Sequence, residues 1–358
     1  MMIRTREGTV AEICVEREDL QEIRVEIGGS RMPALVYTGM TGRVAKGDRV
    51  LVNTTAQFLG LGTGGYDFVI ANLNNTKADI TGAGHIMKLR YTPLQLKCLA
   101  AEEQQSKLHS VIESFESLGG RPVVTIPLHS MLGPICALAK RLKPGVKTGY
   151  VMTDGAALPA AFSKTITDLK KKGLLDIVVT CGNAFGGDLE TVNFYTGIIA
   201  AVEAEKCDLV IVGMGPGITG TGTRYGFTGV EQGYIIDGIN TLGGLPVAVP
   251  RISFSDTRQR HRGISHHSLT VLGRIAKTTS LLPMPELEGT KLEYITGQLR
   301  EHGIEKKHII VFNRGEEVLQ AMEDYDLKTT TMGRNAEEDR DFFLGVGASV
   351  MALRGLLL

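Results

Sequence analysis

The sequence predicts an α/β protein in which a small N-terminal antiparallel β-barrel or sandwich precedes a large unit of βα repeats with a mainly parallel sheet. Between about residues 8 and 73, apolar and polar side chains alternate with a period of two, which is the period of a half-buried strand. After Gly119-Gly120, short apolar runs alternate with helical stretches, as they do in βα units. A chain of 358 residues is long enough for two such units.

The small β unit is expected over residues 1–91, with turn residues such as Gly28-Gly29 between its strands. A connecting helix is expected over residues 92–118. Thr92 is a favourable cap, Pro93 suits the first helical position, and apolar residues follow at spacings of three or four. The expected strands of the β unit cover residues 9–15, 22–27, 31–37, 48–53, 67–71 and 85–91.

The α/β unit is expected over residues 119–358 and holds eight apolar runs that suit strands. Eight runs also fit a (β/α)8-like barrel. An open doubly wound sheet is preferred because the run near residue 282 ends Pro-Met-Pro and the run near residue 330 is mostly threonine, so both are weak strands. The runs cover residues 122–128, 147–153, 175–180, 208–213, 245–252, 280–284, 308–313 and 328–332.

Composition excludes several classes of protein. The 39 lysines and arginines equal the 39 aspartates and glutamates in number, so the global positive charge of non-specific nucleic-acid binders is missing. No apolar run approaches the roughly eighteen residues of a membrane span. Five cysteines without a CxxC pair indicate reduced thiols rather than a disulfide framework. We therefore expect a cytoplasmic protein without a membrane partner.

The segment Gly213–Gly233 carries eight glycines and follows an apolar run that ends at Val212. Its GxGxxG motif is a weak dinucleotide signal, because the glycines continue and Asp237, about twenty positions on, falls inside an expected helix rather than at the end of a strand. A flexible loop whose backbone N–H groups surround an anion explains the pattern better. The candidate ligand-binding residues here are Gly215, Gly217, Gly220, Gly222, Thr223 and Arg224.

The segment Arg251–His267 is rich in arginine and histidine. Arginine forks match phosphate or carboxylate oxygens, although a solvated loop paired with surface acids is the alternative. Ser265 is expected to cap a helix, which would place His266 and His267 in a first turn that favours neutral rings. A divalent metal held by Asp256, His261 and His267 is a further hypothesis, although the spacing fits no zinc signature. The candidate ligand-binding residues are Arg251, Ser253, Asp256, Arg260 and Arg262.

Further candidates follow the predicted strands, because ligands bind at the carboxyl ends of parallel strands. Asp154 and Arg334 are candidate ligand-binding residues, with a helix-capping role as the alternative for Asp154. His129, Glu231 and His266 are the candidate acids or bases, and a solvated helix residue is the alternative for Glu231.

Five segments of the chain resemble an uncharacterised bacterial family, domain of unknown function 3866. They are HSML at 129–132, GYVMTDGAALPAAFS at 149–163, the glycine-rich segment 213–233, RISFSDTRQRHRGISHHS at 251–268 and TTTMGRNAEEDRDFF at 329–343. The resemblance runs nearly the whole length of the chain. It implies a bacterial cytoplasmic protein, but it brings no activity, substrate or catalytic residue.

These patterns favour an enzyme that acts on a phosphorylated or otherwise anionic small molecule by hydrolysis, group transfer or isomerisation. A regulator that binds a nucleotide-like metabolite without turning it over is the alternative. An RNA-associated protein is a weaker alternative, because the chain has no tryptophan and no net charge. The apolar C-terminus suits either docking on its own unit or a homo-oligomer interface.

Overall fold

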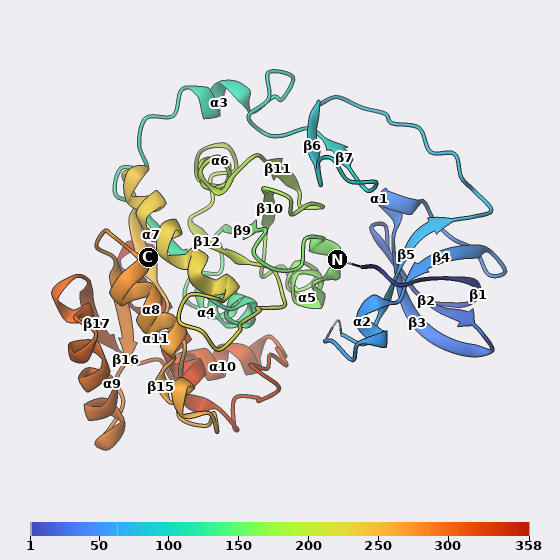
Figure 1. Cartoon of the computed structure of the whole chain (residues 1–358). Coiled ribbons are helices and arrows are strands. Elements are labelled where there is room, and N and C mark those ends of the chain that lie inside the picture. Colours follow the sequence, from blue (N-terminus) through green and yellow to red (C-terminus); the bar gives the residue numbers. More distant parts are fainter. Residues whose placement is uncertain (1, 63, 358) are drawn as a thin grey trace. The chain divides into compact units, whose positions relative to one another are not determined.

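The computed structural model describes residues 2–62 and 64–357, which form two compact units divided between Lys97 and Cys98 (Figure 1). The first unit is a closed five-stranded barrel with the strand order β1-β2-β3-β5-β4. Strand β1 pairs with both β2 and β4, and register shifts along its pairing with β2 let it close the barrel. The strands are β1 (Thr5–Glu16), β2 (Leu20–Ile27), β3 (Ser30–Tyr37), β4 (Arg49–Asn53) and β5 (Asp67–Asn72).

The barrel interior is filled by the apolar half of the alternating pattern, including Val10, Ile23, Val25, Val36 and Val50. The β3–β5 pair is parallel and the other pairs are antiparallel. The expected small β unit is therefore confirmed as a barrel, with one parallel pair that the alternation did not reveal. Short elements of this unit are α1 (Thr38–Thr41), α2 (Thr55–Phe58) and β6 (Ile86–Lys88), and β7 (Leu96–Cys98) spans the boundary after Lys97.

The connecting helix expected over residues 92–118 is wrong except for α3 (His109–Glu113). The Thr92 hydroxyl donates to the carbonyl of Leu89 and accepts from the N–H of Leu94, so it closes a turn rather than starting a helix. Further on, Ala100 forms a parallel bridge with Glu190. The turn at Thr92 and the long-range pairing of Ala100 outweigh the local helical pattern.

The second unit contains an eight-stranded open sheet with the order β11-β10-β9-β12-β8-β13-β16-β17. Every pair of neighbours is parallel, which confirms the α/β prediction and the preference for an open sheet. The strands are β8 (Pro122–Thr125), β9 (Thr148–Thr153), β10 (Ile177–Cys181), β11 (Leu189–Thr191), β12 (Leu209–Met214), β13 (Leu245–Ala248), β16 (Leu281–Pro285) and β17 (Ile309–Asn313).

The run at residues 328–332 is not a strand of this sheet; only Thr331 forms a bridge, with Arg334. Its threonines are β-branched but offer no apolar face to bury, and β11 occupies the far edge of the sheet instead. Strand β11 was not expected because three residues are too few to show a period.

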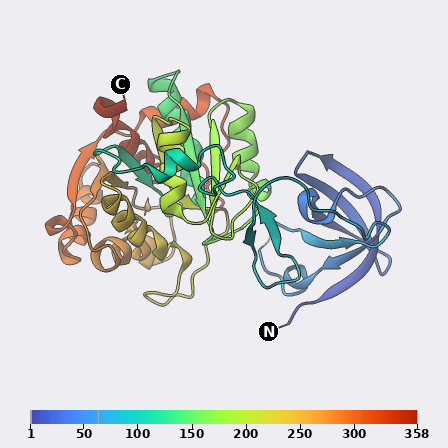
Figure 2. The same cartoon turned by 90° about the horizontal axis from the view of Figure 1, so that it is seen from above.

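Helices cover both faces of the sheet (Figure 2). One layer contains α4 (Leu132–Leu142), α5 (Lys164–Lys171), α10 (Glu317–Asp324) and α11 (Arg340–Met351). The other contains α6 (Phe194–Ile199), α7 (Glu231–Thr241), α8 (His266–Thr270) and α9 (Thr290–Glu301). Among the helices that the structure describes, none combines the length and apolar character needed to cross a bilayer.

The strand order places a topological switch at β8 and β12, which lie side by side at the centre of the sheet. The chain leaves β8 toward β9 on one side, whereas it leaves β12 toward β13 on the other. Such a reversal opens a crevice at the carboxyl ends of the two strands, where ligands of doubly wound proteins bind. The segments that follow these ends begin at Ile126 and Gly215.

Candidate functional site

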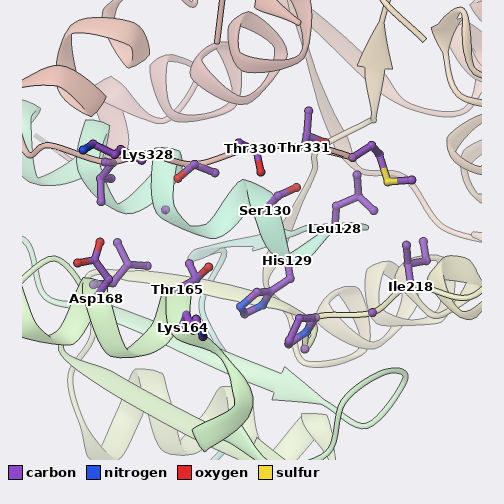
Figure 3. A pocket seen from close by; sticks show the side chains of 18 of the residues that line it. Leu128, His129, Ser130, Lys164, Thr165, Asp168, Ile218, Lys328, Thr330 and Thr331 are labelled. Carbon is purple, nitrogen blue, oxygen red and sulfur yellow. The ribbon is translucent and has the colours of Figure 1, made fainter. Parts of the chain in front are cut away.

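Two cavities open at this edge of the sheet and share the side chains of Leu128, Ile218 and Met332. The larger, of about 730 Å³, is called the lysine cavity. The smaller, of about 210 Å³, is called the arginine cavity. Besides the shared residues, the arginine cavity is lined by Gly220, Gly222, Arg251, Arg258, Arg260, His261 and His267. The lysine cavity includes His129, Ser130, Lys164, Thr165, Lys172, Gly215, Gly217 and residues 326–331 (Figure 3).

The arginine–histidine segment reaches the arginine cavity by folding back as a small hairpin. Strand β14 (Ile252–Ser253) pairs antiparallel with β15 (Gly263–Ile264), and the intervening residues project beyond them. Gly263 has a φ of +66°, and a Cβ there would lie 2.5 Å from the side-chain oxygen of Gln298. Only glycine fits at position 263, where the hairpin turns back.

Asp256 ties the arginines of the hairpin together. It accepts hydrogen bonds from Arg251 Nη2 at 2.8 Å and from Arg258 Nε and Nη2 at 2.9 and 2.8 Å. Arg334 Nη2 lies 3.6 Å from the same carboxylate. The bonds from Arg258, followed by those from Arg251, hold the pKa of Asp256 well below its usual range. Asp256 is therefore an internal counter-ion that orients guanidinium groups.

Arg334 and Ser253 belong to the same frame rather than to the cavity wall. Arg334 donates to Asp339 from Nε at 3.0 Å and from Nη2 at 2.8 Å. The Ser253 hydroxyl lies 2.8 Å from both oxygens of the same carboxylate. Asp339 is fully buried, so these bonds supply the partners that its charge requires.

Arg251 is the most informative side chain of the arginine cavity. Its residue surface is only 6 % exposed, yet its Nη1 has no hydrogen-bond partner among the described residues. Leaving a buried charged donor unsatisfied costs free energy, and native proteins rarely do so. The unpaired donor belongs to a residue that lines the cavity together with Arg258 and Arg260. The guanidinium group of Arg251 therefore has hydrogen-bonding capacity that the described residues leave unused.

Three histidines cluster behind these arginines. The ring centroids of His261, His266 and His267 lie 4.1 to 5.4 Å apart. Burial and then the nearby arginine charges lower the pKa of His261 to about 3. Burial, the neighbouring His266 and the arginines lower that of His267 to about 4. At neutral pH these rings are uncharged.

Local structure fixes the orientation of the rings. Ser265 caps α8, as expected, and its hydroxyl also lies 2.8 Å from Nδ1 of His261. His267 stacks on Phe227 with a centroid distance of 4.0 Å. His266 does not line the arginine cavity, and its buried Nε2 has no partner among the described residues.

The structure brings the glycine-rich segment to both cavities. Gly215 and Gly217 line the lysine cavity, and Gly220 and Gly222 line the arginine cavity. A Cβ on Gly220 would lie 3.3 Å from the ring of His267, so the loop packs directly against the histidines. After β12, the first α-helix is α7. It begins at Glu231, well beyond the GxGxxG motif. The arrangement is not that of a dinucleotide-binding turn.

Three more candidate ligand-binding residues lie outside both cavities, as Ser253, Asp256 and Arg334 do. The Thr223 hydroxyl holds the loop turn, 2.9 Å from that of Thr221 and 3.1 Å from the N–H of Gly226. Arg224 lines neither cavity. Arg262 lies over the ring of Phe254 at 5.5 Å, away from the cavity. Residues Gln259–His261 form a 3-10 turn, so the two-residue repeat of a strand is lost there, and Arg260 lines the cavity whereas Arg262 does not.

His129 lines the lysine cavity, and both of its ring nitrogens have partners. Nε2 lies 2.7 Å from the hydroxyl of Ser163, and Nδ1 lies 3.1 Å from that of Tyr150. Tyr150 in turn donates to the carbonyl of Met214 at 2.7 Å. Burial lowers the pKa of His129 to about 4. The ring therefore joins the ends of β8 and β12 to the start of α5 through its hydrogen bonds.

Glu231 and Asp154 form a separate cluster outside both cavities. Oε1 of Glu231 accepts a hydrogen bond from Thr153 at 2.5 Å, and a Cβ on Gly155 would lie 2.7 Å from Oε2. Burial raises the pKa of Glu231 to about 7, and the charge of Asp154 adds to the rise. Asp154 accepts from the N–H of Asn183 at 3.0 Å. The three candidate acids and bases, His129, Glu231 and His266, thus occupy three different places.

The metal hypothesis is not supported by the geometry. Within residues 2–62 and 64–357, no three His, Cys, Asp or Glu side chains converge as a metal-binding group. Asp256 faces guanidinium groups instead of His261 and His267. An aspartate bonded to two arginines has no lone pair directed at a cation shared with the histidines.

Several residues of the site had no signal in the sequence strong enough to single them out. Tyr150 lies in the middle of a buried strand, and Ser163 caps α5. Residues 328–331 were expected to form a strand but line the lysine cavity instead. Cys181, at the end of β10, is a packed core residue whose thiol lies 3.4 Å from the carbonyl of Met152.

The fold and the site together define a two-unit protein whose larger unit is a doubly wound parallel α/β structure with two joined, basic cavities at its switch point. Residues 33–350 match the family model described as a protein of unknown function, DUF3866. This match covers most of the chain, and the chain belongs to that family. No curated protein matches the chain.

Proposed function

We propose that the larger unit binds a phosphorylated or otherwise anionic small molecule in the arginine cavity and acts on it as an enzyme. The observation that carries the proposal is the unpaired, buried Nη1 of Arg251 in a cavity wall that also holds Arg258 and Arg260. Guanidinium groups bind phosphate or carboxylate oxygens through paired hydrogen bonds. An anion would supply the missing acceptor.

The charge balance of the wall supports this ligand class. Arg251, Arg258 and Arg260 carry three positive charges, Asp256 supplies one negative charge at this wall, and His261 and His267 are neutral. An excess of positive charge in a concave cavity attracts an anion more strongly than the same charges on a flat surface. The backbone of Gly220 and Gly222 can approach the ligand closely because no side chain intervenes.

His267 and His261 are the proton acceptors that the cavity offers for catalysis. Both line it and both are neutral in the empty site. A bound anion would offset the arginine charges that help to depress their pKa values, so the rings would become stronger bases when the ligand is present. General base catalysis by such a group can serve hydrolysis, group transfer or isomerisation.

A ligand-binding regulator is the second candidate function. One observation favours it: Glu231, the carboxyl group whose pKa is raised to about 7, lies outside both cavities. The cavity histidines are weak bases in the empty site. Binding without turnover would need only the arginines.

The binding proposal is tested with Arg260→Ala and the matched control Arg262→Ala, which removes an exposed arginine two residues away. Affinities for inorganic phosphate, sugar phosphates and nucleotides are measured by calorimetry. We expect Arg260→Ala to weaken the best ligand about tenfold or more, the usual value of a charge-assisted hydrogen bond. Arg262→Ala should bind as the unaltered protein does. Equal effects of the two substitutions, or no anion binding at all, would refute the proposal.

Turnover of the best ligand then separates the two candidates. An enzyme should convert it, and His267→Gln should lower kcat while leaving the affinity nearly unchanged. A regulator should bind the ligand and release it chemically intact. We also propose a cytoplasmic location, because the five cysteines lack disulfide-like spacing.

The RNA alternative rests on the first unit alone. Five-stranded Greek-key barrels include oligonucleotide-binding folds, but a fold does not imply a function. The outer positions of β2 and β3 carry charges of both signs, such as Glu22, Arg24, Glu26 and Arg31, rather than a basic aromatic platform. This alternative predicts RNA affinity that falls steeply with salt.

A further inference from the structure

The lysine cavity has several features that anion binding in the arginine cavity does not explain. The positive ends of two helices meet there: Ser130 lies just before α4, and Thr165 lies in the first turn of α5. These helices have 11 and 8 residues. Lys164 and Thr165 line one wall, and Lys328, Thr330 and Thr331 line the opposite one (Figure 3).

An unpaired buried hydroxyl in the same wall points to a ligand. Thr331 is 1 % exposed, and its Oγ1 has no hydrogen-bond partner among the described residues. Its backbone is held firmly, because its N–H and carbonyl both bond to Arg334 at 2.8 and 2.9 Å. A fixed hydroxyl without a partner is costly unless something in the cavity bonds to it.

The charges lining the lysine cavity favour an acidic group. Three lysines and two aspartates line it, and His129 is neutral. Asp168 is paired with Lys172 at 3.1 Å, and the amine of Lys172 also donates to the carbonyl of Asp326 at 2.7 Å. Three lysines against two aspartates leave a net formal charge of +1 on the lining, and Lys328 lies on the wall opposite the helix ends.

We propose that the lysine cavity is a second anion subsite and that the ligand carries two acidic groups, one in each cavity. Leu128, Ile218 and Met332 are common to both cavities, so the part of the ligand that joins the two groups passes an apolar waist. The substrate class is then a bisphosphorylated compound, or a phosphorylated compound with a carboxylate. This inference rests on the proposed function, since it assumes the first acidic group lies at Arg251, Arg258 and Arg260.

Alkanediphosphonates of increasing chain length, each compared with the alkylphosphonate of the same length, test the proposal by calorimetry. The alkyl chain suits the apolar waist, and the phosphonates resist hydrolysis. We expect affinity to peak at one length, where the two-headed compound binds about tenfold or more tighter than its one-headed partner, equivalent to about 1.4 kcal/mol. Lys328→Ala and Thr331→Val should each reduce that ratio and leave binding of the one-headed compound unchanged.

Lys171→Ala is the matched control, because Lys171 is an exposed lysine of α5 outside the cavity. It should keep the full ratio. Arg260→Ala should weaken both series. If one-headed compounds bind through Arg260 but a second head adds nothing, the second subsite is refuted and the proposed function stands. If the ratio persists in both Lys328→Ala and Thr331→Val, the second head lies elsewhere and the inference is wrong. If neither series binds, the proposed function fails as well.

Discussion

Glu231 shows how burial sets the chemistry of a single residue. Its side chain is nearly buried, its Oε1 is bonded to Thr153, and burial raises its pKa to about 7. The carboxyl group therefore holds a proton more tightly in the folded protein than in the unfolded chain. Its contribution to stability is fully present below its ordinary pKa of 4.5 and is lost as the pH rises through about 7.

Glu231→Gln should remove this pH dependence, because glutamine keeps the shape and the acceptor but cannot ionise. Relative to the unaltered protein, the variant should gain on the order of 3 kcal/mol in free energy of unfolding between pH 4.5 and pH 8. Urea unfolding of both proteins at several pH values measures the difference. A difference that stays constant across this range would mean that the Glu231 pKa is not raised.

Also at the scale of single residues, the direction of an arginine side chain decides whether it lines the arginine cavity. The sequence led us to expect Arg262, and not Arg258, among the ligand-binding residues. In the structure, Arg258 lines the arginine cavity and Arg262 does not. Both lie in one exposed, charged stretch, so composition cannot separate them. The hairpin of β14 and β15 decides which of them faces the cavity.

At the scale of elements, α11 depends on a close approach between backbones. Gly347 in this helix faces Gly315, which lies between β17 and α10. A Cβ on Gly347 would overlap the carbonyl oxygen of Gly315. Gly345 lies two residues earlier, on the opposite side of the helix, and a Cβ there would meet only Ile252, at 3.7 Å. Gly345 therefore has room for a side chain, whereas Gly347 does not.

Gly347→Ala should destabilise the protein by about 1–3 kcal/mol or more, because backbone atoms cannot move aside as a side chain can. Gly345→Ala should be neutral or should stabilise by about 0.5–1 kcal/mol, because alanine is the better helix former. Thermal and urea unfolding of the two variants measure both effects. Similar losses in both would show that α11 does not pack as described.

At the scale of the whole molecule, each unit encloses an apolar core of its own. We expect scanning calorimetry to resolve two transitions, one for each unit. A phosphorylated ligand at about a hundred times its dissociation constant should stabilise the larger unit by about 2.7 kcal/mol and leave the barrel transition in place. Arg260→Ala should abolish the shift. A single transition that moves as a whole would show that the units unfold together.

The sequence alone determined the class of both units. The period of two specified the barrel strands, and the buried runs from Pro122 to Asn313 specified seven strands of the parallel sheet, because burial leaves a local pattern in either case. The glycine-rich and arginine–histidine segments were also visible, since glycines and arginines cluster in short stretches of the chain. The helix expected over residues 92–118 was wrong, because long-range pairings fixed that segment.

Only the tertiary structure decided which of these residues form a site. The order of the strands sets β8 beside β12, and this order depends on contacts between residues far apart in the chain. It brings Gly220, Arg251 and His267 to one cavity, adds residues 328–331 to the next, and leaves Glu231 outside both. Asp256 became a counter-ion for arginines because the hairpin turned them toward it. Local patterns encode how each segment folds, whereas the neighbours of a side chain come from packing across the whole sheet.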